Sequence, residues 1–125
     1  SYDLVKTLNC RTKIPLTTTI NTLKKINTLT NIELHILSIC RKDYQIQEKN
    51  DWLDKYAPFF DKNKRTIISK ENNPNYQSKE LKANYLKSLN INEQIVCVDD
   101  DNEVLKHINQ ELPNIILYQD SELID

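Results

Sequence analysis

The hydrophobic and polar residues of this chain alternate between short apolar runs and stretches with helical periodicity. The apolar runs are rich in β-branched residues and contain few polar interruptions, which is typical of strands buried on both faces of a parallel sheet. They predict strands over residues 32–37, 65–69, 95–98 and 114–118.

The stretches between these runs repeat apolar residues at spacings of three and four, which predicts helices. These stretches are residues 17–29, 43–56, 78–89 and 102–112. Ser78 is a suitable N-cap for the third helix, and Pro58 ends the second. Strands alternating with helices of this length imply right-handed βαβ units. The predicted fold class is therefore α/β, a doubly wound Rossmann-like parallel sheet with helices on both faces.

Length and composition narrow the class of protein. The chain has 125 residues, of which 38% are hydrophobic and 28% charged, so a single domain over residues 1–125 is expected. No apolar run approaches the roughly 20 residues that span a membrane. The net charge of −1 gives no reason to expect binding to nucleic acid. Three widely spaced cysteines without a CxxC pair favour a reducing, cytoplasmic setting.

The candidate catalytic and binding residues lie near the predicted strand ends, where ligands bind in doubly wound sheets. Asp3 stands where a first strand would have to end, and Ser38 follows the strand 32–37. Lys82 lies on the third helix, and Asp99 and Asp100 follow the strand 95–98. A carboxylate can attack phosphorus, a hydroxyl and an ammonium can hold phosphate oxygens, and an acidic pair can bind Mg²⁺.

The segment around Asp3 resembles the first motif of the haloacid-dehalogenase-like (HAD-like) superfamily, which reads Asp-x-Asp-x-Thr. Residues 3–7 of this chain read Asp-Leu-Val-Lys-Thr, a degenerate copy. Val5 stands where the family has its general acid/base aspartate, and Lys6 replaces a small residue. The strand expected before Asp3 is nearly missing from the sequence, so we predict that the first strand is truncated.

The other family motifs have counterparts in the same order, so the resemblance covers nearly the whole chain. Ser38 is similar to the second motif, Lys82 to the third, and the pair Asp99–Asp100 to the fourth. The short spacing between Asp3 and Ser38 leaves room for one helix and one strand but for no cap domain.

Each of these assignments has an alternative. Asp3 would also fit a frayed terminal residue without a role, and Ser38 a strand-end hydroxyl that caps backbone groups. Lys79 competes with Lys82 for the third-motif role, since both lie near the start of the same helix, and the helical register favours Lys82. Asp99 and Asp100 would also suit the N-terminus of the following helix, where acidic residues complement the helix dipole.

The resemblance implies a cap-less, Mg²⁺-dependent phosphohydrolase of phosphatase or nucleotidase style. Asp3 would form an aspartyl-phosphate, Ser38 and Lys82 would hold the phosphoryl oxygens, and Mg²⁺ would bind to Asp3, Asp99 and Asp100. Thr7 and Arg41 are candidates for substrate contact. The substrate would be a small phosphorylated molecule, with nucleotides among the options. Without a cap, loops or a neighbouring subunit of a homo-oligomer would supply specificity.

Three other functions compete with this one. Val5 and Lys6 favour a catalytically silent HAD-like domain that binds a ligand or a partner. Dehalogenase chemistry tolerates Val5, but the sequence shows no cap that would close over a small acid. The segment 95–101 also resembles a response-regulator receiver, yet too little chain follows it for the strands and helices which that family requires.

Overall fold

The structure is a computed structural model that describes residues 2–7 and 17–119, with side chains described for residues 20–119. In these residues, strands alternate with helices along the chain. The strands are β1 (Tyr2–Thr7), β2 (Ile32–Cys40), β3 (Arg65–Ser69), β4 (Gln94–Asp99) and β5 (Ile116–Gln119). The helices are α1 (Thr17–Ile26), α2 (Tyr44–Tyr56), α3 (Ser78–Ser88) and α4 (Asn102–Glu111), with a short 3₁₀ turn, η1 (Lys62–Lys64).

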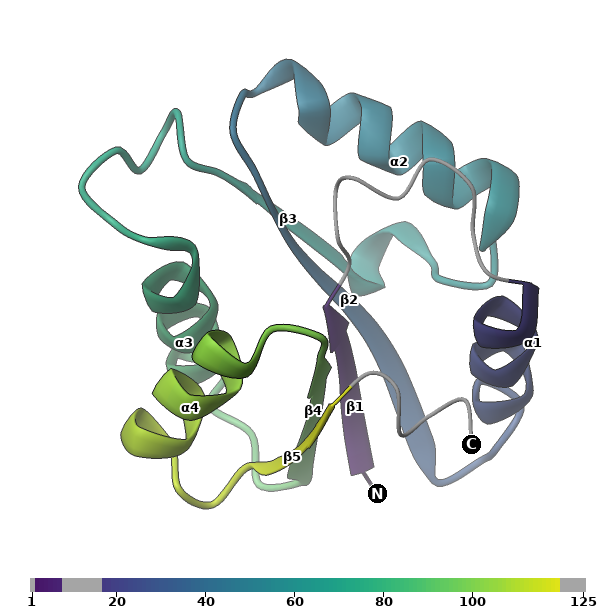
Figure 1. The fold of residues 1–125 in the computed structure, drawn as a ribbon. Coiled ribbons are helices and arrows are strands. Elements are labelled where there is room, and N and C mark those ends of the chain that lie inside the picture. Colours follow the sequence, from purple (N-terminus) through teal and green to yellow (C-terminus); the bar gives the residue numbers. More distant parts are fainter. Residues whose placement is uncertain (1, 8–16, 120–125) are drawn as a thin grey trace.

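The five strands form one sheet in the order β3-β2-β1-β4-β5, and every neighbouring pair is parallel. Helices α1 and α2 cover one face of this sheet, and α3 and α4 cover the other (Figure 1). The α/β class and the parallel pairing predicted from the sequence are confirmed. None of the described helices is long and apolar enough to cross a membrane.

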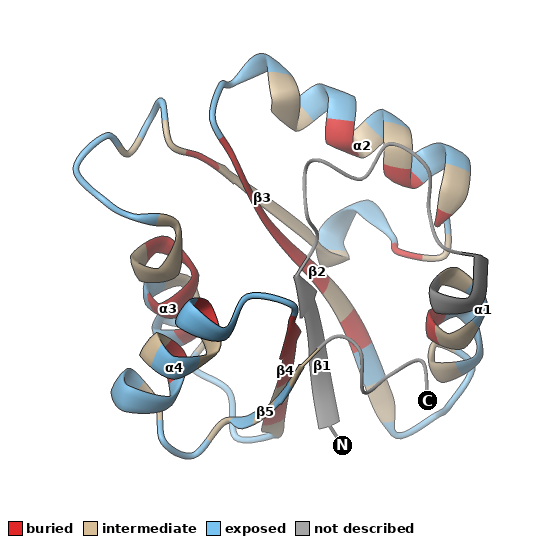
Figure 2. Ribbon diagram, in the orientation of Figure 1, coloured by how far each residue is buried: buried red, intermediate tan, exposed pale blue. Residues whose placement is uncertain are grey.

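The hydrophobic core formed by residues 20–119 consists of two clusters, one on each face of the sheet. Ile36 of β2 packs in the first cluster with Leu53 of α2, whereas the next strand residue, Leu37, packs in the second with Leu86 of α3. Figure 2 shows the buried residues along β2 and β4 and on the helix faces that cover them. Burial on both faces explains why these strands are almost continuously apolar.

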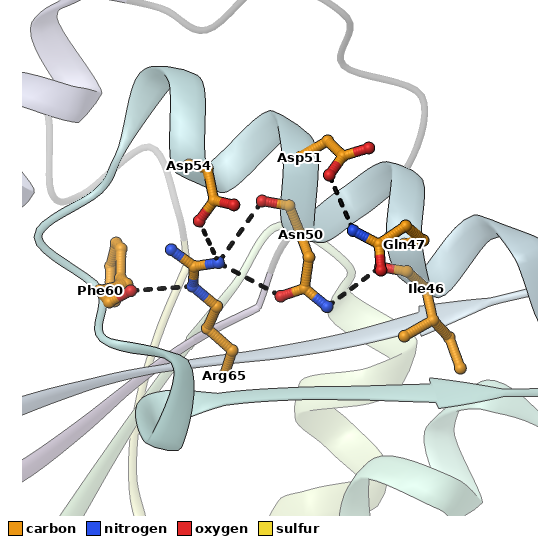
Figure 3. Close-up of polar contacts among 7 residues, drawn as sticks. All are labelled: Ile46, Gln47, Asn50, Asp51, Asp54, Phe60 and Arg65. Carbon is orange, nitrogen blue, oxygen red and sulfur yellow. Dashed lines mark hydrogen bonds and ion pairs between the residues drawn. The ribbon is translucent and has the colours of Figure 1, made fainter.

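A buried arginine joins the start of β3 to α2. The Arg65 side chain is 4% exposed, and its Nε donates to the Phe60 carbonyl at 2.8 Å. Its Nη1 donates to Asp54 Oδ1 at 2.8 Å and, more weakly, to two oxygens of Asn50. Figure 3 shows the oxygen atoms of Phe60, Asn50 and Asp54 that accept hydrogen bonds from the Arg65 guanidinium. Because a buried guanidinium needs several acceptors, this network fixes the turn between α2 and β3.

Several predicted element boundaries are wrong, and two of them have an identifiable physical cause. Gln77, not Ser78, is the N-cap of α3, because Gln77 and Glu80 form a reciprocal capping box in which the Gln77 N–H donates to Glu80 Oε1 at 2.9 Å. Strand β2 continues three residues beyond its predicted end at Leu37, since its ladder with β3 extends to the pair Cys40 and Ser69.

Candidate functional site

Two of the predicted site residues lie at one edge of the sheet. The pairing of β1 with its neighbours places Asp99 level with Thr7, and Ser38 one residue beyond that level. Only β1 separates β2 from β4, so the backbones of Ser38 and Asp99 stand two strand spacings apart, or about 10 Å. Both residues are buried, at 0% and 1% exposure. The carboxyl edge therefore contains a buried polar site around the end of β1.

Lys82 and Asp99 form a buried ion pair on the α3 side of this site. Lys82 Nζ lies 2.9 Å from Asp99 Oδ2, and the other carboxylate oxygen accepts the backbone N–H of Asp101 at 2.9 Å. The lysine side chain is 10% exposed and the aspartate side chain 1%. Of the two lysines that the sequence offered, Lys82 rather than Lys79 is the partner of Asp99.

Ser38 has a partner that sequence analysis did not identify. Lys49, on α2, is buried and donates from Nζ to the Ser38 hydroxyl and to the Ile39 carbonyl, the latter at 3.2 Å. Ser38 lies inside β2, two residues before its end, so the prediction that it follows the strand is wrong. The available signal was the spacing of Lys49 and Leu53, which are the two buried residues of α2.

The two polar pairs approach the carboxyl end of β1 from opposite faces of the sheet. Ile36, two residues before Ser38, packs in the cluster under α1 and α2. Cys97, two residues before Asp99, packs in the cluster under α3 and α4. Since strand residues two apart point to the same side, Ser38 and Lys49 lie on the first face and Lys82 and Asp99 on the second.

The structure does not bring the backbone of Asp3 to this edge. Asp3 is the second residue of β1 and pairs with Glu33 and Ile95, near the beginning of the sheet. Asp99 lies four residues beyond Ile95, which corresponds to about 13 Å along a strand. The prediction that the first strand ends at Asp3 is therefore wrong, because β1 continues to Thr7. The side chains of Asp3 and Thr7 lie outside the described residues.

The remaining candidates flank the site. Arg41 is exposed directly after β2, where its N–H donates to Gln45 Oε1 at 2.9 Å. Asp100 is exposed directly after Asp99. These positions are compatible with contact to a ligand that approaches from solvent.

The predicted Mg²⁺ site lies only partly within the described residues. Among those residues, no three His, Cys, Asp or Glu side chains are grouped so that they could hold a metal ion. The predicted set includes Asp3, whose side chain is not described. Asp99 and Asp100 supply the oxygen donors that Mg²⁺ prefers, although Asp99 is already engaged by Lys82 and by a backbone N–H. Mg²⁺ binding remains a prediction.

Comparison with known proteins assigns no family to the chain. The sequence matches no protein-family model, no curated protein and no solved structure at a significant level. Function is therefore inferred from the polar site at the carboxyl edge.

Proposed function

We propose that the chain is a HAD-like domain that binds the phosphoryl group of a small phosphorylated ligand at the carboxyl edge of its sheet. The strand order 3-2-1-4-5 matches the first five strands of the Rossmann order and supports a doubly wound, Rossmann-like fold. In such sheets ligands bind beyond the carboxyl ends, where the strand order reverses. Here the reversal lies between β1 and β4, next to Asp99.

The observation that carries this proposal is the buried Lys82–Asp99 ion pair. Transferring two charges out of water costs free energy, and a protein in which hydrophobic residues replace such a buried pair is often more stable. This pair stands at the ligand-binding edge, level with Thr7 at the end of β1. Lysine has three N–H donors, and among the described residues Asp99 is the acceptor for one of them. The others are suited to charge-assisted bonds with phosphate oxygens.

Phosphate-ester hydrolysis is the second candidate function. The arrangement of Ser38, Lys82 and Asp99 around one edge favours it, because the family resemblance assigns these residues to one phosphohydrolase site. Such a reaction would need the Asp3 carboxylate as nucleophile, with Mg²⁺ at Asp99 and Asp100 supplying charge neutralisation. Two features count against hydrolysis. Asp3 lies early in β1, and position 5 is a valine where the family has an acidic residue. Binding is therefore the favoured function.

Isothermal titration with phenyl phosphate, with and without Mg²⁺, tests the binding proposal. Lys82→Met is expected to weaken affinity by about tenfold or more, because a hydrogen bond from a charged donor is lost. Lys79→Met on the same helix is the control and should bind like the parent. The double variant Lys82→Met/Asp99→Asn removes both charges of the ion pair, so it separates lost binding from lost folding. A folded parent that binds no phenyl phosphate would contradict the proposal.

Turnover of p-nitrophenyl phosphate, measured on the same preparations with Mg²⁺, separates the two functions. For a binding domain, the parent, Asp3→Asn and Val5→Asp should all stay at the background rate. A hydrolase would lose activity with Asp3→Asn and gain it with Val5→Asp, since a general acid/base contributes about 10²–10⁴-fold. That pattern would make hydrolysis, rather than binding alone, the function of the domain.

A further inference from the structure

Lys49 is a buried cation whose hydrogen-bond partners among the described residues are neutral. Its exposure is 7%, and its Nζ donates to the Ser38 hydroxyl and the Ile39 carbonyl. No carboxylate in the described part of the chain forms an ion pair with Lys49, whereas Lys82, buried to the same degree, is neutralised by Asp99. Apart from Arg65, whose buried guanidinium pairs with Asp54, the buried charged residues of the described structure are therefore two lysines and one aspartate.

An excess positive charge in a buried site is unfavourable for the ligand-free protein. Neutral acceptors satisfy the N–H groups of an ammonium, but they leave its charge uncompensated. A methionine would fill the same space on α2 without this cost. The charge that would balance Lys49 has the sign of the phosphoryl group proposed to bind at the same edge.

We infer that Lys49 is a second cation that contacts the phosphoryl group, from the α2 side and opposite Lys82. This inference rests on the proposed phosphate-binding function. Ser38, which is fully buried, then acts mainly by holding the Lys49 ammonium in position rather than as a phosphate ligand of its own.

The number of available donors indicates the class of ligand. An ammonium group has three N–H donors. Among the described residues, Lys49 uses two of them for Ser38 and Ile39, which leaves one. Lys82 uses one for Asp99, which leaves two. These three donors match the three terminal oxygens of a phosphate monoester. A phosphodiester has only two free oxygens and a single negative charge. The site is therefore expected to select monoesters over diesters.

Titration with methyl phosphate and dimethyl phosphate tests this inference on the full chain. The parent should bind methyl phosphate more tightly than dimethyl phosphate. Lys49→Met should weaken methyl phosphate binding by about tenfold or more. Lys55→Met removes an exposed lysine from the same helix and lowers the net charge equally, so it should stay within about twofold of the parent.

Thermal unfolding without ligand supplies a readout that a purely structural lysine would not produce. Lys49→Met should unfold at the same temperature as the parent or higher, because it removes a buried charge that no carboxylate of the described residues balances. A ligand-binding lysine thus shows weaker binding with unreduced stability. If Lys49→Met does not fold, Lys49→Gln, which can still donate to Ser38, replaces it with the same expected loss of affinity.

The outcomes separate the inference from the function on which it rests. If Lys49→Met binds like Lys55→Met while Lys82→Met binds weakly, the phosphate site stands and the role of Lys49 is refuted. A lower unfolding temperature with unchanged affinity would likewise make Lys49 a structural residue. If the parent binds neither ester, the proposed function and this inference both fail.

Discussion

Neutralising Asp99 should destabilise the protein far more than neutralising a surface carboxylate. Asp99→Asn keeps the side-chain shape and can still accept the Asp101 N–H, but it leaves the Lys82 ammonium buried without its anion. Removal of one partner of a buried ion pair costs about 3–5 kcal/mol. A domain is stable by roughly 5–15 kcal/mol, so about a third of the total stability is at stake.

The double variant Lys82→Met/Asp99→Asn shows how much of this cost is electrostatic. Each single change removes one charge of the pair and leaves the other buried, whereas the double change removes both. The double variant should therefore be more stable than the sum of the single losses predicts, by a coupling energy of about 2 kcal/mol or more.

Urea unfolding, followed by the fluorescence of the single tryptophan, measures these losses. Trp52 packs against the first core cluster, so its emission reports on the core. The control is the cycle on Lys87 and Glu111, a surface pair 3.3 Å apart with side chains 42% and 43% exposed. Its coupling should stay below about 1 kcal/mol. Additive losses for Lys82 and Asp99, with unchanged m-values, would refute the reasoning.

Two further predictions concern the fold. Arg65→Lys should lower the free energy of unfolding by about 1–3 kcal/mol, because a single ammonium cannot serve the acceptors at Phe60, Asn50 and Asp54 together; urea unfolding equal to that of the parent would show that the guanidinium geometry is unimportant. Glu80→Ala should cost about 0.5–2 kcal/mol by removing the α3 capping box, whereas Glu80→Gln keeps an acceptor and should cost less. Equal melting temperatures for both Glu80 variants would contradict the capping role.

The order and type of the elements could be predicted because they depend on local patterns. The predicted strand 65–69 has the same bounds as β3. The ends of each predicted helix lie within three residues of the ends of the observed helix. The end of β2 could not be predicted locally. It depends on pairing with β3, including Cys40 opposite Ser69, and those residues are far apart in the sequence.

Register is the main reason why the site was only partly predicted. The segment 2–7 has the composition of a strand, but composition does not reveal which of its residues stands at the carboxyl edge. That depends on how β1 aligns with β2 and β4, which long-range packing decides. The motif resemblance placed Asp3 at the end of a strand, and the observed register places Thr7 there instead. Lys82 and Asp99 came together as expected because α3 directly precedes β4 in the same βα alternation.

The position of Lys49 follows from the geometry of a βα unit. In such a unit the helix begins near the carboxyl end of the strand before it, as α2 does after β2 (Figure 1). Helical side chains lean toward the helix N-terminus, so a buried lysine in the second turn extends back toward that strand end. Lys49 in α2 and Lys82 in α3 both occupy such second-turn positions. A lysine in the apolar stripe of a helix, one turn past its start, is therefore a sequence signal for a cation at the carboxyl edge of the sheet. The spacing of Ile46, Lys49 and Leu53 on one helix face thus contains the information that a search for family motifs missed.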